Sequence, residues 1–115
     1  MKKGRSLKMP TEKDIALVDY LLRSTQAGKT KWEPTARANE FTASVRGKYN
    51  VVIGLRHERE GWETVDHYVL IITDEQEREL VNLTDYGPVH DLYELARRAS
   101  LNVDAAIDDI IAEEI

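Results

Sequence analysis

The sequence predicts a small α+β domain with an N-terminal helix, an antiparallel meander of three to four strands and two C-terminal helices. Apolar residues recur at helical spacing near both ends of the chain, whereas they alternate with polar residues between residues 40 and 73. Short turns that contain glycine separate the alternating stretches, which is typical of hairpins. The 115 residues suit one domain with one hydrophobic core. We assign residues 1–10 to a flexible basic tail and residues 11–115 to a single domain.

The first helix is indicated by signals at both of its ends. Thr11 is a suitable N-cap, and Asp14 stands three residues later, as in a capping box. Gly28 is well placed to end the helix, because glycine adopts the left-handed conformation that follows many helices. The apolar stripe between these signals comprises Ile15, Val18, Leu21 and Leu22.

The apolar pattern also predicts how the first three strands pair. A three-residue loop over residues 46–48 places Val45 opposite Tyr49 and keeps the apolar residues of both strands on one face. For the second hairpin, the pattern favours Glu58 opposite Trp62. The predicted core face then comprises Phe41, Ala43, Val45, Tyr49, Val51, Ile53, Leu55, Val65, His67, Val69 and Ile71.

The stretch from Thr73 to Leu83 is open to two interpretations. Thr73 and Gln76 form a capping box that favours a short helix, whereas the apolar residues near Leu83 favour a fourth strand. We take the strand. Pro88 then begins the next helix, and the stripes of the two C-terminal helices are Val89, Leu92, Tyr93, Ala96 and Ala99, and Val103, Ile107, Ile110 and Ile111.

Several segments resemble a group of small uncharacterised bacterial proteins that carry a Gly-Lys-x-x-Trp loop after the first helix. These segments are GKTKW, EFTASVRGKYNVVI, YVLIITDE and LYELARRASLNVDAAID. The resemblance spans nearly the whole chain from residue 11 and implies a strand over residues 79–83. It implies no activity, because none is known for the group.

Charge and composition narrow the function classes. The net charge is −5, yet the first ten residues hold four basic groups and no acidic one, so the remaining residues carry a net charge of −9. An acidic body repels a phosphate backbone, which argues against a nucleic-acid partner. The absence of cysteine excludes disulfides and thiolate sites. No apolar run is long enough for a membrane span or a signal peptide, so we expect a cytoplasmic protein without a membrane partner.

The chain shows no motif of catalytic chemistry. It contains no G-x-S-x-G, no glycine-rich phosphate loop and no H-E-x-x-H, so we expect no enzyme and no cofactor. In the predicted register, His57 and His67 lie four residues apart along the strands, or about 13 Å, which is too far for joint metal ligation. We therefore expect no metal site, with His67 in the core and His57 in solvent.

Trp32 lies in a loop of the sequence GKTKWEP and has two possible roles. Its ring could stack on a base or a peptide, helped by Lys29 and Lys31. Alternatively, it fills the open end of the core between the first helix and the first strand. Tryptophan buries about 150–250 Å², and the chain has only two tryptophans, five tyrosines and one phenylalanine. The burial argument favours the core role.

The third strand suggests an interaction surface, because it is apolar on both sides. An antiparallel sheet with one wet face should alternate, yet the second face of the predicted sheet would carry a continuous apolar patch. We therefore predict a non-enzymatic protein-interaction module that self-associates or docks a protein partner through this face. The predicted patch comprises Val52, Tyr68, Leu70 and Ile72.

A second function remains open from the sequence. Arg56 points away from the predicted core and could hold an anion. The alternative is thus a small-ligand or nucleotide-binding protein with a pocket near Trp32, Arg46 and Arg56.

Overall fold

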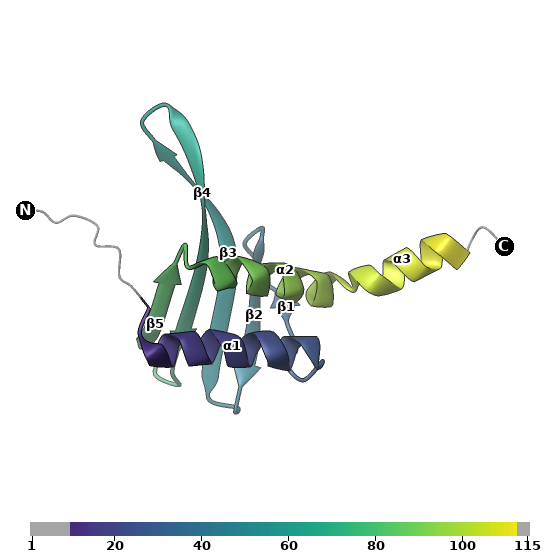
Figure 1. Cartoon of the computed structure of the whole chain (residues 1–115), viewed down its shortest axis with the longest axis horizontal. Helices are drawn as coiled ribbons and strands as arrows, with labels where there is room; N and C mark the ends of the chain where they lie inside the picture. Colours follow the sequence, from purple (N-terminus) through teal and green to yellow (C-terminus); the bar gives the residue numbers. More distant parts are fainter. Residues whose placement is uncertain (1–9, 113–115) are drawn as a thin grey trace, which may run out of the picture.

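A five-stranded antiparallel sheet carries two helices on one face, and a third helix extends away from this body (Figure 1). The computed structural model describes residues 10–112, so the predicted tail lies outside the described residues except for Pro10. The α+β class is confirmed, with five strands rather than three or four. The elements are α1 Glu12–Gln26, β1 Glu33–Pro34, β2 Glu40–Val45, β3 Tyr49–Glu60, β4 Glu63–Thr73, β5 Glu79–Thr84, α2 Gly87–Leu101 and α3 Val103–Ala112.

The predicted capping box of α1 is present. The Asp14 backbone N–H donates to Thr11 Oγ1 at 3.1 Å, and the Thr11 backbone N–H donates to Asp14 Oδ2 at 2.9 Å. The buried side of α1 differs from the predicted stripe, because Ile15 is 46% exposed. The helix is rotated so that its buried residues are Val18, Leu21, Ser24 and Thr25.

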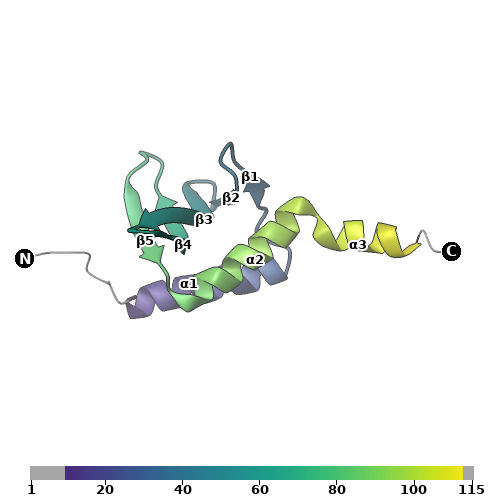
Figure 2. The same cartoon turned by 90° about the horizontal axis from the view of Figure 1, so that it is seen from above.

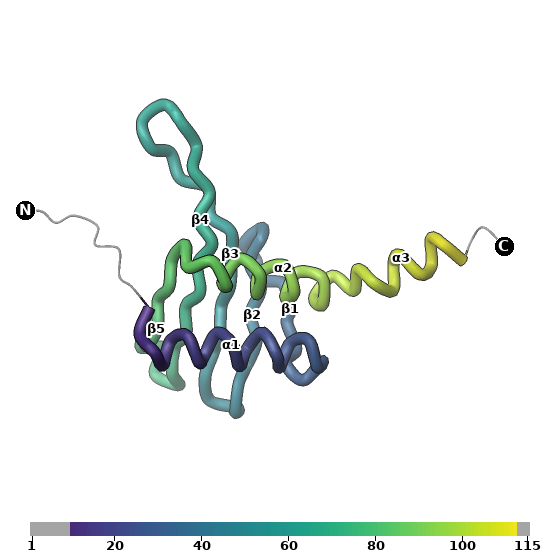
Figure 3. Tube along the Cα trace, in the orientation of Figure 1, coloured from purple at the N-terminus to yellow at the C-terminus, as the bar shows by residue number. Residues whose placement is uncertain are grey.

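Helix α2 lies across the sheet, and α1 packs beside it on the same face (Figures 2 and 3). Its predicted stripe is largely confirmed, with Ala99 exposed at the end that leads to α3. No helix among residues 10–112 combines the length and the apolar content needed to span a membrane. The core contains Val18, Leu21, Trp32, Phe41, Ala43, Val51, Ile53, Leu70, Ile72, Leu83, Val89, Leu92, Tyr93 and Ala96.

The first hairpin has the predicted register, with Val45 opposite Tyr49. The second does not. Glu60 pairs with Glu63 across a two-residue turn, in which Gly61 has a φ of 67°. The true pairing differs from the predicted one by three residues. An odd shift turns every side chain of a strand to the other face.

In this register, the side chains of β4 face the opposite sides of the sheet from those predicted. Leu70 lies opposite Ile53 on the face that the helices cover. Tyr68 and Ile72 lie on the same side as Leu70, because side chains two residues apart share a face. The residues predicted to be core on this strand therefore lie on the open face. These are Val65, His67, Val69 and Ile71.

The stretch after β4 contains a tight turn followed by the predicted strand β5. Asp74 Oδ1 accepts hydrogen bonds from the backbone N–H groups of Gln76 and Arg78, at 2.9 and 3.0 Å. The pKa of Asp74 is lowered chiefly by the Arg78 backbone bond. This aspartate closes the turn and leads the chain into a strand, so the helix alternative is wrong for this stretch.

Candidate functional site

Helix α3 has no buried residue in the part of the chain that the structure describes. Asn102 has a left-handed backbone, with φ 55° and ψ 46°, and ends α2 just before α3 begins. The exposed fractions are 41% for Ile107, 66% for Ile110 and 61% for Ile111. Water therefore reaches three large apolar side chains on one short helix.

These isoleucines share one side of the helix. Positions 107, 110 and 111 follow the three- and four-residue spacing of a helical face, and Val103 continues the row by one turn. We call Val103, Ile107, Ile110 and Ile111 the α3 stripe. An apolar stripe of this kind normally packs against another element, but the body of this chain does not cover it.

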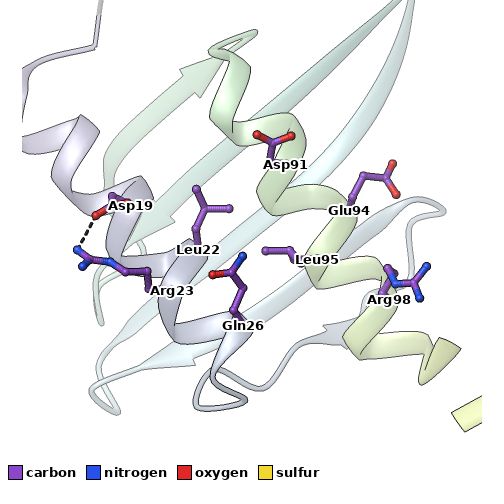
Figure 4. Close-up of a pocket in the computed structure, with 8 residues that line it drawn as sticks. All are labelled: Asp19, Leu22, Arg23, Gln26, Asp91, Glu94, Leu95 and Arg98. Atoms are coloured by element: carbon purple, nitrogen blue, oxygen red, sulfur yellow. Dashed lines mark ion pairs between the residues drawn. The ribbon is translucent and has the colours of Figure 1, made fainter. Parts of the chain in front are cut away.

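A groove of about 470 Å³ runs between α1 and α2 (Figure 4). Leu22 of α1 and Leu95 of α2 point into the space between the helices. A neighbouring hollow of about 350 Å³ continues the groove toward the start of α2 and adds Ile15, Tyr86 and Pro88. The charged and polar rim at the Leu95 end comprises Asp19, Arg23, Gln26, Asp91, Glu94 and Arg98.

The predicted partner-binding patch does not exist as one surface. Leu70 and Ile72 are 0% and 6% exposed on the covered face, and Tyr68 is partly buried against the same core. Only Val52 lies on the open face, half-buried opposite Ile71. The predicted register placed these four residues on one face of the sheet. The observed register of the second hairpin puts Val52 on the opposite face from the other three.

The predicted ligand residues are also apart. Trp32 is 5% exposed, and its Nε1 donates to Thr25 Oγ1 at 3.0 Å, which confirms its core role. Arg46 lies exposed in the β2–β3 turn with a φ of 60°. Arg56 lies on the open face of the sheet, across from the core that holds Trp32, so these residues do not line one pocket.

His67 is surrounded by three carboxylates on the open face. Its Nδ1 lies 2.7 Å from Asp85 Oδ2, and its Nε2 lies 3.4 Å from Glu60 Oε2 and 3.5 Å from Glu58 Oε1. The hydrogen bond to Asp85 is the main cause that raises the pKa of His67, although partial burial opposes it. Sequence reasoning missed this cluster because Asp85 comes from the loop after β5.

His67 should make stability depend on pH. Because its pKa is raised from 6.5 on folding, its contribution is complete below that value and is lost as pH rises through the folded pKa. The free energy of unfolding of the wild type and of His67→Gln can be compared by urea unfolding, with a chelator present to keep the protein free of metal ions. The difference between the two should be largest at low pH and smaller toward pH ~9. Asp85→Asn should weaken this dependence. A difference that grows with rising pH would contradict the assignment.

Comparison with protein-family models, curated protein sequences and solved structures found no match for this chain. The resemblance through the Gly-Lys-x-x-Trp loop therefore stays a prediction, and function has to be inferred from the surfaces described above.

Proposed function

We propose that the protein is a non-enzymatic interaction module that self-associates through α3. The observation that carries this proposal is the exposed α3 stripe. Burial of one isoleucine side chain contributes about 1.5–3 kcal/mol, so several together can offset part of the cost of association. The stripe takes the place of the sheet face that the sequence pattern suggested, and the absence of enzymatic activity stays a prediction.

The proposed partner of α3 is the α1–α2 groove of a second copy. Helix α3 has ten residues, which corresponds to about 15 Å. The groove extends along α1 from Ile15 to Gln26, or about 17 Å. The two lengths match. The apolar floor of the groove would cover the isoleucines of the stripe.

The direction of α3 favours an exchange between two copies. Figure 1 shows α3 pointing away from the body that holds α1 and α2. Asp104 of α3 pairs with Arg98 of the same chain, and Arg23 of the groove rim pairs with Asp19, so both rim arginines already have a carboxylate partner. If each copy places α3 in the groove of the other, the assembly closes as a twofold dimer with two equivalent contacts.

The first test changes one side of α3 at a time. Ile110→Lys should convert a wild-type dimer into a monomer in sedimentation equilibrium, because it places a charge in the middle of the stripe. Ala105→Lys adds the same charge on the opposite side of the helix and should leave the dimer intact. Circular dichroism should be unchanged in both variants, since neither residue is buried. A wild type that stays monomeric at high concentration would refute the proposal.

A mixing experiment tests the groove as the receptor. Ile15→Lys alone should also weaken the dimer. A mixture of Ile15→Lys and Ile110→Lys chains should recover part of the association, because one of the two contacts is then intact. If Ile15→Lys chains dimerise as tightly as the wild type, α3 binds elsewhere, as in direct pairing of two α3 helices.

A further inference from the structure

The hairpin of β3 and β4 continues beyond the sheet as an arm, which Figures 1 and 3 show rising from the body. Two glutamates of the His67 cluster and His67 itself lie on this hairpin, whereas Asp85 lies in the loop after β5. Glu58 and Glu60 come from β3, and His67 comes from β4. One ligand atom from each, the histidine nitrogen and two carboxylate oxygens, lies within 4.8 Å of the others.

The spacing of these atoms matches a metal coordination sphere. Ligands that sit 2.0–2.2 Å from a tetrahedral zinc ion lie about 3.3–3.6 Å from one another. His67 Nε2 is 3.5 Å from Glu58 Oε1 and 3.4 Å from Glu60 Oε2. Two of these contacts therefore already have the length of a tetrahedron edge, and one oxygen of each glutamate lies within 4.8 Å of the other.

Asp85 provides a second and independent feature of a metal centre. A histidine ligand normally donates its other ring N–H to a carboxylate, which fixes the tautomer and the ring orientation. Asp85 Oδ2 is 2.7 Å from Nδ1, so a proton held there leaves the Nε2 lone pair facing the two glutamates. The Asp85 backbone N–H donates to the Tyr68 carbonyl at 2.9 Å, which ties this loop to β4.

We propose that Glu58, Glu60 and His67 bind a divalent transition-metal ion such as zinc, with Asp85 as the residue that positions His67. An imidazole ligand favours zinc over magnesium and calcium, which prefer oxygen ligands alone. The two carboxylates balance the charge of the ion. Three protein ligands leave a coordination position for water or for a group of another molecule.

Arg56 is a cation of the open face on the strand next to His67. Arg56 lies opposite His67 in the strand register, and its guanidinium is 4.0 Å from Glu40 Oε2. Glu40 therefore offers this arginine a carboxylate outside the proposed ligand set.

Calorimetric titration of the full chain with ZnCl₂ tests the proposal directly. The wild type should bind one equivalent of zinc, and His67→Ala should remove this binding. His57→Ala is the matched control, because His57 lies on the same arm beside Asp66 and is not in the cluster. Asp85→Asn keeps all three ligands and should weaken zinc binding by about 10–100-fold.

Two further measurements keep the test decisive. Circular dichroism establishes that each variant is folded, and Glu60→Gln replaces His67→Ala as the ligand variant if the latter unfolds. NMR of the imidazole nitrogens should show zinc at Nε2 of His67 with Nδ1 still protonated. Zinc binding that survives both ligand variants, or that His57→Ala removes equally, would overturn the site. Equal competition by MgCl₂ would overturn the assignment to transition metals.

Discussion

Trp32→Ala is expected to lower the free energy of unfolding by about 3–5 kcal/mol. Its ring belongs to the hydrophobic core and is only 5% exposed. Truncation would leave a cavity in the core. It would also remove the hydrogen bond from Nε1 to Thr25 Oγ1, which leaves a buried hydroxyl without this partner. Denaturant unfolding followed by circular dichroism measures the loss.

The second tryptophan is the matched control for this experiment. Trp62 is 97% exposed at the tip of the hairpin arm, so Trp62→Ala should change stability by no more than about 0.5 kcal/mol. In a Trp62→Phe background, the fluorescence of Trp32 should have the short-wavelength maximum of a buried indole. A nearly neutral Trp32→Ala, with emission like that of tryptophan in water, would restore the binding role considered from the sequence.

Leu70→Lys is expected to unfold the protein or to lower its stability by more than about 4 kcal/mol. Leu70 is fully buried in the middle of the sheet, between Ile53 of β3 and Leu83 of β5. The substitution loses an apolar side chain and forces an ammonium group into a fully buried site, where it has to lose its charge or disrupt the packing.

Val52→Lys is the control on the other face of the same sheet. Val52 is only partly buried there, and a lysine can extend its ammonium to water along the open surface. We expect a loss of about 1 kcal/mol or less. Denaturant unfolding of the two variants decides between the registers of the second hairpin. A folded Leu70→Lys with wild-type stability would support the register that the sequence pattern favoured.

The element types could be predicted from the sequence because each has a local signal. The Thr11 capping box, the alternation of β2 and the proline of α2 all depend on residues a few positions apart. β1 has only two residues, Glu33 and Pro34, so no alternation could show it. It pairs with Thr42 and Phe41 through the backbone, which leaves no mark in the side-chain pattern.

The register of the second hairpin could not be predicted for a physical reason. Residues 68–72 are apolar at every position, so either face of β4 satisfies a hydrophobic core. The turn decides the register instead, through the left-handed backbone of Gly61. The predicted pairing includes Trp62 in the strand, whereas Trp62 lies exposed in the turn.

The two candidate sites were also only partly predictable from the sequence. Helical spacing correctly placed the isoleucines of α3 on one side, but spacing does not reveal whether a neighbouring element covers that side. The His67 cluster joins residues from β3, β4 and the loop after β5, so it depends on the register of the second hairpin, which the sequence pattern predicted wrongly. Only the folded chain brings these groups together.

The strand order of the sheet has a consequence for how the chain folds. The five strands pair in the order in which they occur in the chain. Each pair of neighbouring strands is therefore joined by a short loop, and closing a short loop costs little conformational entropy. The sequence separation between contacting residues is small within the sheet. It is large for the contacts between α1 and α2, because all five strands lie between these helices in the chain. The sheet can therefore form by successive pairing of neighbouring strands, one hairpin at a time. The docking of α1 on α2 is the step that brings together distant parts of the chain, and it completes the burial of the hydrophobic core.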